Sequence, residues 1–215
     1  MNDNFALIAA AIGAGMYYAL NSQPTTDSSG AVLLDAVNPQ ETTIYEDAMI
    51  ALDPGTYGAA DVAPGTAAAN IRAFLDTIAY SEGTDGPDGY RTLFGGGLFN
   101  SYADHPRQLF SFTNSAGQTL KTSAAGRYQF LASTWDDLRA KLGLPDFSPA
   151  SQDAGAVELI RQRGALNDVK AGRISQAIAK CSPIWASFPG AGYSQPERQL
   201  ASLIDTYTNQ GGATA

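Results

Sequence analysis

The sequence predicts an α+β domain over residues 70–215, mainly helical, with a small antiparallel hairpin lobe and a cleft between two lobes. Several segments repeat apolar residues at the spacing of one helix face, and one stretch between them has the pattern of a β-hairpin. All 13 basic residues also fall in this part, whereas residues 1–69 hold none. The net charge of −8 therefore belongs to the N-terminal third, and we expect a domain boundary near residues 64–70.

The first helix of the domain is expected over Asn70–Ser81. Its apolar residues follow the i, i+3, i+4, i+7 spacing of one face, namely Ile71, Phe74, Leu75 and Ile78. Glu82 comes four residues after Ile78 and extends this stripe, and Gly83 follows, where helices often end in a left-handed residue. Desolvation raises the pKa of a carboxyl group on the buried side of a helix end, which suits a general acid. The alternative is a Glu82 that turns outward into solvent.

The rest of the domain combines a loop, a hairpin and further helices. A Gly-rich loop is expected over Gly83–Pro106, followed by strands Gln108–Phe112 and Gln118–Thr122 that pair across the turn Asn114–Gly117. Caps and periodicity predict four more helices. Two of them are Thr134–Gly143 and Ile174–Cys181. Between these lies a helix with Ser148 as its cap and Pro149 as its first residue, which ends before Gly164. The last helix opens with Ser194 and Glu197 as a capping box and runs to about Asn209.

Composition excludes several classes of function. Neither part of the chain is basic, which argues against a nucleic-acid partner. The single cysteine, Cys181, allows no intramolecular disulfide, and we expect it in the core with Trp135 and Trp185. The single histidine, His105, and the lack of metal-binding motifs give no basis for a metal, a cofactor or a Ser–His mechanism. We expect His105 to make structural hydrogen bonds.

The N-terminal third begins with an uninterrupted apolar run, Phe5–Leu20. We expect residues 1–20 to form a hydrophobic helix. At about 1.5 Å per residue the apolar run itself spans about 24 Å, somewhat less than a hydrocarbon core of about 30 Å. A membrane anchor is favoured; a cleaved signal and a helix that docks on a partner, such as a virion protein, are the alternatives. Residues 21–69 read as an acidic tether rich in Pro, Gly and Thr, with a small packed subdomain as the alternative.

Five segments, in this order, carry a resemblance to a known family. They are NIRAFLDTIAYSEGT (70–84), LFNSYADHPR (98–107), SAAGRYQF (123–130), LGLPDFSPASQDAGA (142–156) and RGALNDVKAGRISQAIAKCSPIWASFPGAGYSQ (163–195). Over about residues 70–212 the chain resembles the lambda-type phage endolysins, which are peptidoglycan lytic transglycosylases with a lysozyme-like fold. The resemblance implies a lysozyme-like α+β domain and says nothing about the N-terminal third.

The resemblance also implies a reaction. This family cleaves the β-1,4 bond between N-acetylmuramic acid and N-acetylglucosamine without water, and Glu82 matches its single catalytic Glu. That Glu protonates the glycosidic oxygen, then takes a proton from the muramoyl C6 hydroxyl, which attacks C1 and closes a 1,6-anhydro ring. A hydrolase of the usual type needs a second carboxylate. The candidates, all in turn-rich chain, are Asp85, Asp88 and Asp104.

A few further side chains are expected to bind the substrate. Tyr128 and Gln129 match the family's sugar-contacting stretch; one should face the cleft and the other the core, and we favour Gln129 as the ligand contact. Tyr193, on a Gly-rich loop, and Asp104 complete the predicted substrate-binding set. For Arg127 a carboxylate partner, a lactyl group of the substrate and a surface salt bridge are all open.

Three functions are open at this point. The favoured one is a lytic transglycosylase that acts on peptidoglycan glycan strands during host lysis or virus entry. A lysozyme-type muramidase would hydrolyse the same bond, and a membrane- or virion-anchored structural protein would only bind glycan. In the favoured account the domain is tethered to a membrane and faces the host periplasm and cell wall, or is carried on a virion.

Overall fold

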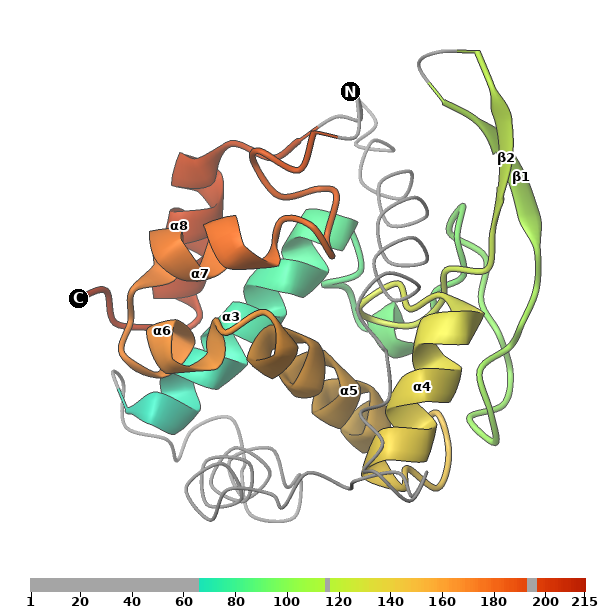
Figure 1. Ribbon diagram of the computed structural model, residues 1–215, viewed down its shortest axis with the longest axis horizontal. Helices are drawn as coiled ribbons and strands as arrows, with labels where there is room; N and C mark the ends of the chain where they lie inside the picture. The colour runs from blue at the N-terminus through green and yellow to red at the C-terminus, as the bar shows by residue number, and fades with distance from the viewer. Residues whose placement is uncertain (1–65, 115–116, 193–196) are drawn as a thin grey trace, which may run out of the picture.

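The computed structural model describes residues 66–114, 117–192 and 197–215 (Figure 1). The predicted hydrophobic helix over residues 1–20, almost all of the predicted tether, and Tyr193 lie outside the described residues. In the ranges that are described, none of the helices has the length and apolar character needed to cross a membrane. The membrane anchor concerns residues outside these ranges and stays a prediction.

The first described helix, α3, spans Ala67–Glu82 and confirms the predicted apolar stripe. Each of its stripe residues, Ile71, Phe74, Leu75 and Ile78, is buried. The helix begins three residues before the predicted start at Asn70, because the Thr66 side chain caps it by accepting a hydrogen bond from the Ala69 amide at 3.1 Å. It ends at Gly83, whose φ of 70° is the left-handed conformation expected at that position.

Five further helices follow along the described chain. They are α4 (Ala132–Leu142), α5 (Pro149–Gln162), α6 (Leu166–Lys170), α7 (Ile174–Cys181) and α8 (Leu200–Asn209). The bounds of α7 are as the sequence predicts, and Ser148 caps α5 with Pro149 in its first turn. Helix α6 has no counterpart in the sequence prediction, because its five residues are too few to produce a periodic pattern.

The capping box predicted at Ser194 and Glu197 is wrong. Helix α8 begins only at Leu200, and Glu197 precedes it in non-helical chain. The Glu197 carboxylate instead accepts hydrogen bonds from the amides of Gly190 and Gly192, at 2.9 and 3.2 Å. The side chain therefore closes the preceding Gly-rich loop, because those backbone donors compete successfully for it.

The predicted hairpin is confirmed as a two-stranded antiparallel sheet. Strand β1 (Phe110–Thr113) pairs with β2 (Thr119–Thr122), with Phe110 opposite Thr122. The Asn114 side chain accepts a hydrogen bond from the Gln118 amide at 2.9 Å and so stabilises the turn. A short 3₁₀ helix, η2 (Gly89–Arg91), lies in the loop between α3 and the hairpin.

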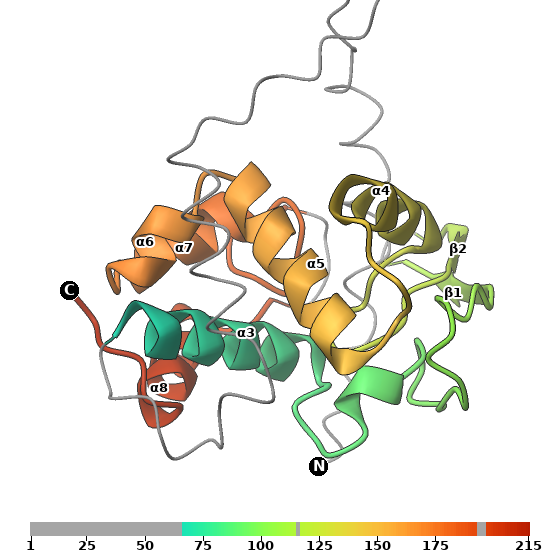
Figure 2. The ribbon, with the colours of Figure 1, turned by 90° about the horizontal axis from the view of Figure 1, so that it is seen from below.

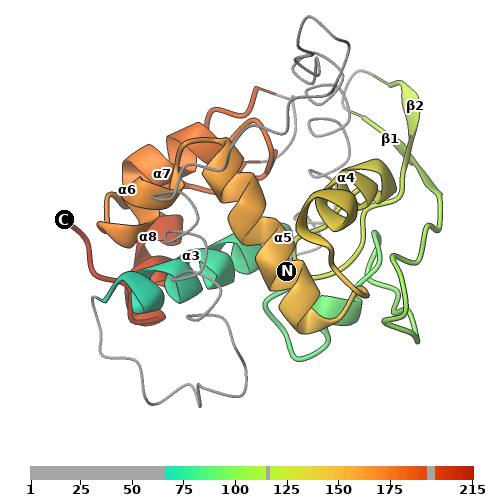
Figure 3. The ribbon, with the colours of Figure 1, turned by 60° about the horizontal axis from the view of Figure 1, so that its bottom comes forward.

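Helix α5 divides the domain into two sides. Helices α3, α6, α7 and α8 lie on one side of it, and α4 with the hairpin lies on the other, as Figures 1 and 2 show. Helix α3 packs against α5, α6 and α8, and α4 packs against α5. Figure 3 shows the same division from a third direction. The cleft expected between the lobes stays a prediction.

The core is continuous across α5 and includes both tryptophans, as the sequence predicts. Trp135 and Trp185 are fully buried, and so is Cys181. The Trp135 ring meets the Phe147 ring edge-on, with 4.6 Å between centroids. Burial raises the pKa of the Cys181 thiol to about 12, which leaves it unreactive and consistent with its predicted packing role.

Candidate active site

The most unusual side chain in the described domain is Glu82, the last residue of α3. It is completely buried, which rules out the outward orientation. Oε1 accepts a hydrogen bond from the Ser187 hydroxyl at 2.6 Å. Oε2 is buried and has no hydrogen-bond partner in the described part of the chain. A carboxyl group with one oriented and one unpartnered oxygen is prepared to exchange a proton through the second oxygen.

The environment of Glu82 keeps it protonated at neutral pH. Burial raises the pKa of Glu82 to about 8, whereas the hydrogen bond from Ser187 and the positive charge of Arg198 act in the lowering direction. Desolvation prevails because no cation lies within ion-pair distance of this carboxyl in the described residues. The neutral acid can therefore give a proton, and the resulting carboxylate can take one back.

Ser187 comes from the segment between α7 and α8, more than 100 residues away in sequence. The neighbouring Phe188 ring packs on Phe74 of α3, with 6.2 Å between centroids. The amide of Arg198 donates to the Ser187 carbonyl at 2.8 Å, and its guanidinium lies 4.8 Å from the Tyr80 ring centroid. These contacts hold the segment against the end of α3. Ser187 lies inside the WASFPGAGY motif, but nothing in the sequence pointed to its hydroxyl.

The loop that follows Glu82 is fixed by the segment after the hairpin. The Thr84 hydroxyl lies 2.5 Å from the Arg127 carbonyl oxygen, and the Thr84 amide donates to Ala79 at 2.8 Å. The Arg127 guanidinium forms an ion pair with Asp76 of α3 at 2.5 Å and stacks over Tyr90 at 5.1 Å. The carboxylate partner, one of the three roles left open for Arg127, is therefore the one observed.

Tyr128 faces the core rather than an open surface. It is buried, its ring meets Phe130 edge-on, and its hydroxyl donates to Asp153 Oδ1 at 2.6 Å. Tyr90 donates to the same oxygen at 2.8 Å. Burial raises the pKa of Asp153 to about 6 against these two hydrogen bonds. Asp153 was not predicted as a functional residue. It precedes the buried Ala156 and Val157 of α5 by three and four residues, and this helix spacing to buried apolar residues is the signal that identified Glu82.

Gln129 is buried, and contacts with two backbone carbonyl groups orient its side chain. Its backbone φ is 49°, an uncommon value for a residue other than Gly. The side-chain amide donates to the Gly126 carbonyl at 2.9 Å and lies 3.3 Å from that of Thr92. Its Oε1 is buried and unpartnered among the described residues. The predicted sugar contact by Gln129 stays a prediction, and so does that by Tyr193, outside the described residues.

The three candidate second acids do not share the environment of Glu82. Asp85 and Asp88 are exposed, and Asp88 lies 3.8 Å from Arg91. Asp104 accepts a hydrogen bond from the His105 amide at 2.8 Å and pairs with Arg107 and Arg139 at 3.1 and 3.3 Å. These contacts lower the pKa of Asp104. Its predicted contact with substrate stays a prediction.

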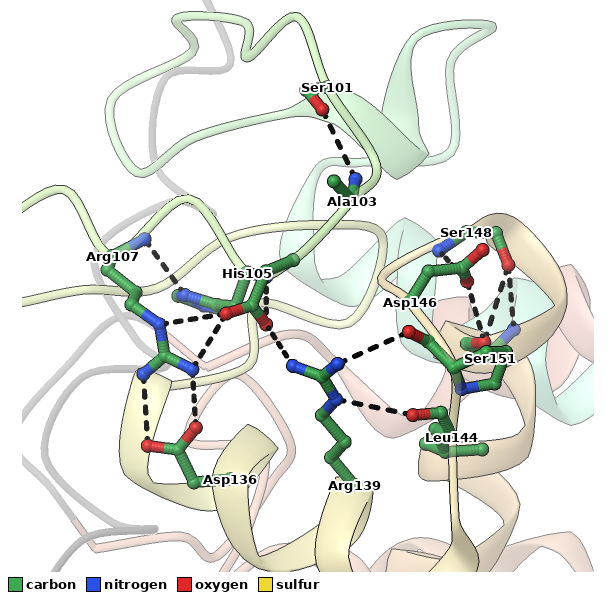
Figure 4. Close-up of polar contacts among 12 residues, drawn as sticks. Ser101, Ala103, His105, Arg107, Asp136, Arg139, Leu144, Asp146, Ser148 and Ser151 are labelled. Atoms are coloured by element: carbon green, nitrogen blue, oxygen red, sulfur yellow. Dashed lines mark hydrogen bonds and ion pairs between the residues drawn. The ribbon is translucent and has the colours of Figure 1, made fainter.

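The Asp104 turn is part of an ion-pair cluster that joins the loop before the hairpin to α4. Figure 4 shows the Arg107 guanidinium beside Asp136, and the two pair at 2.5 Å. The His105 ring accepts from the Arg107 amide at Nδ1, 3.0 Å, and its Nε2 lies 2.9 Å from the Phe130 carbonyl oxygen. Nε2 must then be the donor, so the ring is neutral. The predicted structural role of His105 is confirmed.

The described residues contain no cluster of metal-binding side chains. Across residues 66–114, 117–192 and 197–215, no three His, Cys, Asp or Glu side chains come together in a way that could hold a metal ion. The two other buried acids, Glu158 and Asp168, are both paired with basic side chains. Glu82 is therefore the buried acid in the described domain that lacks an ion-pair partner.

Comparisons with known proteins identify relatives of this chain. A family model described as Endolysin matches residues 72–214. The endolysin of Escherichia phage lambda is 50% identical over 147 residues, 66% of this chain and 90% of the relative. That of Escherichia phage P2 is 46% identical over 160 residues, 68% and 95% of the two chains. The structure of bacteriophage lambda lysozyme complexed with a chitohexasaccharide is similar with a TM-score of 0.64 and 47% identity, over 68% of this chain and 97% of that one.

Proposed function

The chain belongs to the endolysin family of phage enzymes that degrade cell-wall peptidoglycan, and from that premise we propose that it is a lytic transglycosylase. The bond cleaved is the β-1,4 bond between N-acetylmuramic acid and N-acetylglucosamine. The product carries a 1,6-anhydromuramoyl end. The observation that carries this proposal is Glu82, a buried carboxyl with an unpartnered Oε2 and no ion-pair partner among the described residues.

One carboxyl group is enough for this reaction if it acts twice. Neutral Glu82 first gives its proton to the glycosidic oxygen as the bond to C1 breaks. The carboxylate then takes the proton of the muramoyl C6 hydroxyl while that oxygen bonds to C1, so the acid is regenerated. A pKa of about 8 supports the first step, because the group is mostly protonated at neutral pH. A hydrolase of the usual type would need a second carboxylate near the bond, and Asp85 and Asp88 are exposed.

Gln129 is the side chain we assign to substrate recognition. Its free Oε1 could accept a hydrogen bond from a hydroxyl or an acetamido N–H group of the glycan, which would satisfy a buried acceptor. The glycan complex of the lambda lysozyme, a relative of similar fold, supports an oligosaccharide of N-acetylated sugars as a ligand here too. Tyr193 and Asp104 complete the proposed set, whereas the Tyr128 hydroxyl is engaged with Asp153.

Mass spectrometry of purified peptidoglycan after digestion tests the reaction. Anhydromuropeptides are expected from the wild type and none from Glu82→Gln, which keeps the size of the side chain but cannot exchange the proton. Asp85→Asn, three residues along in exposed chain, is the matched control and should leave the products unchanged. Reducing-end products would make the enzyme a muramidase, with Asp85, Asp88 or Asp104 as the second acid. No soluble product from folded protein would favour a glycan-binding protein.

We propose further that the apolar run Phe5–Leu20 anchors the enzyme to a membrane. The predicted tether, residues 21–69, is shortened at its C-terminal end to residue 65, because Thr66 caps α3 and Ala67 begins it. The run is long and uncharged enough to enter a bilayer, although short for a full span. Partitioning of the full chain into vesicles should be compared with that of a chain starting at Gly65, which retains the Thr66 cap of α3. Equal solubility of the two without detergent would contradict the anchor.

A further inference from the structure

The hydroxyl groups of Ser187 and Ser81 form a short chain of hydrogen bonds that ends at the Glu82 carboxyl. The Ser187 oxygen lies 2.6 Å from Glu82 Oε1 and 3.0 Å from the Ser81 oxygen. The Ser81 hydroxyl also lies 2.8 Å from the Ile78 carbonyl oxygen, one turn back in α3. Ser81 and Ser187 are both buried, so solvent offers them no other partners. The mechanism of the proposed reaction uses neither hydroxyl.

In the ionised form of Glu82 both carboxylate oxygens can only accept, so the hydrogens in this chain can be assigned by counting donors. A hydroxyl has one hydrogen, whereas a backbone carbonyl can only accept. The Ser81 hydrogen must therefore go to Ile78, which makes Ser81 an acceptor toward Ser187. The Ser187 hydrogen then has two acceptors, Ser81 and Glu82 Oε1, and the shorter contact is to Glu82. With its hydrogen on Oε1, Ser187 leaves Oε2 as the oxygen without a partner.

The two ends of this chain are held independently of the acid. Ser81 belongs to the last turn of α3, and Ser187 belongs to the segment before α8, whose Phe188 packs on Phe74 and whose Ser187 carbonyl accepts from the Arg198 amide. The hydroxyl of Ser187 is thus fixed relative to the end of α3. A carboxyl group that accepts one hydrogen bond from a fixed donor cannot rotate freely to exchange its two oxygens.

We propose that Ser187 is a positioning residue that reserves Oε2 of Glu82 as the oxygen that gives and takes the proton, and that Ser81 competes with Glu82 for the Ser187 hydrogen. This rests on the proposed role of Glu82 as the acid. Because Ser187 donates to Oε1 of the carboxylate, the proton that Glu82 gains is placed on Oε2; it passes from there to the glycosidic oxygen and returns to Oε2 from the C6 hydroxyl. The Ser187 hydrogen stays on its own oxygen throughout, so no further proton acceptor is needed.

The two serines should shift the acidity of Glu82 in opposite directions. In Ser187→Ala the carboxylate loses its donor, so the ionised form is less stable and the pKa of Glu82 rises. In Ser81→Ala the Ser187 hydrogen has Glu82 as its remaining acceptor, so the ionised form gains and the pKa falls. Arg198 is the charged group of the described residues that acts on the Glu82 pKa, and it is unchanged in both variants.

The experiment measures initial rates on purified peptidoglycan from pH 5 to pH 10 for the full-length wild type, Ser187→Ala, Ser81→Ala and Ser187→Thr. We expect Ser187→Ala to lower kcat about 10-fold or more with little change in KM, because the proton is misplaced while the glycan still binds. The pH at which its rate falls on the alkaline side of the pH–rate profile should move to higher pH. For Ser81→Ala the same fall should move to lower pH. Ser187→Thr keeps the hydroxyl and should recover most of the lost kcat. Ser182→Ala, a buried hydroxyl that donates to Ala179, is the matched control and should behave as wild type.

A second measurement keeps the result clear if a variant folds poorly. Titration of the Glu82 carboxyl by ¹³C NMR, with the signal assigned by its loss in Glu82→Gln, reads the same pKa shifts without turnover. Shifts of the same sign for Ser187→Ala and Ser81→Ala, or a Ser187→Ala enzyme with wild-type kcat, would overturn the positioning role. An active Glu82→Gln enzyme would instead overturn the proposed function, so the two failures are distinguishable.

Discussion

Tyr128 and Asp153 form a partly buried hydrogen bond, 2.6 Å from the phenol oxygen to Oδ1, that joins the segment after the hairpin to α5. Tyr90 donates to the same oxygen at 2.8 Å, and the Arg127 guanidinium lies over the Tyr90 ring. Burial still raises the pKa of Asp153 to about 6. The segment that carries Gln129 is thus held in place by the hydrogen bond from Tyr128 to Asp153, whose ionised form is destabilised by burial.

Removal of the Tyr128 hydroxyl should therefore destabilise the domain in a pH-dependent way. An Asp with a raised pKa in the fold is most favourable when protonated, so stability falls as the pH rises from about 4 through about 6. Tyr128→Phe deprives the ionised carboxylate of a donor, which increases that loss. We expect a cost of about 1–3 kcal/mol at pH 8 and less at pH 4.5, measured by urea unfolding.

Tyr207→Phe is the matched control for this prediction. Tyr207 is also buried, but its hydroxyl lies 3.3 Å from the neutral Ala213 carbonyl oxygen. Its loss should cost a similar amount at both pH values, because no titrating partner is involved. Equal losses at pH 4.5 and pH 8 for Tyr128→Phe would show that the Asp153 charge does not contribute.

Glu82 should make the domain less stable as the pH rises, because the buried carboxyl group is ionised at high pH. The pKa of Glu82 is raised to about 8, so the folded protein holds this proton where the unfolded chain releases it. The unfolding free energy of the domain is therefore not reduced by Glu82 below the ordinary glutamate pKa of about 4.3. It falls as the pH rises from there, until the pH passes about 8. We expect Glu82→Gln to gain stability relative to wild type between pH 5 and pH 9, measured by thermal melting. A constant difference between the two proteins across this range would contradict the raised pKa.

Much of the architecture around Glu82 could be predicted from local patterns. The apolar stripe of α3, the left-handed Gly83 and the hairpin each depend on residues close together in sequence, where helix period and turn chemistry act. The same rule places Glu82 on the buried face. The tryptophans and Cys181 follow from their apolar character and helix spacing.

The rest depends on contacts between distant segments. Ser187 meets Glu82 only because the chain between α7 and α8 folds back on α3, and no local pattern encodes that contact. The Glu197 capping box failed for the same reason, since two amides of the preceding loop take its carboxylate. Tyr128 and Gln129 were expected to face opposite ways, yet both are buried, because Asp153 holds the first while Gly126 and Thr92 lie against the second.

Arg198 should lower the pKa of Glu82 through its positive charge alone, without a hydrogen bond to the carboxyl group. Its positive charge lowers the pKa of Glu82, and its guanidinium is held 4.8 Å from the Tyr80 ring centroid. Arg198→Gln removes this charge, so the pKa of Glu82 should rise and the high-pH limb of activity should move to higher pH by a few tenths to about one pH unit. Lys170→Gln, the same charge change on α6, should leave the limb in place. A shift to lower pH in Arg198→Gln would contradict the electrostatic role.

Gly89 should be essential for the loop that follows the acid. A Cβ at this position would lie 1.8 Å from the Thr84 carbonyl oxygen, a backbone atom that cannot move away without displacing the chain next to Glu82. We expect Gly89→Ala to cost about 3 kcal/mol or more in unfolding free energy and to lower kcat, measured by urea unfolding and by the peptidoglycan assay. Gly86→Ala is the matched control, because a Cβ there would meet nothing within 4 Å. It should unfold within about 1 kcal/mol of the wild type; an equal loss in both variants would mean that loop entropy, not the close approach to Thr84, sets the cost.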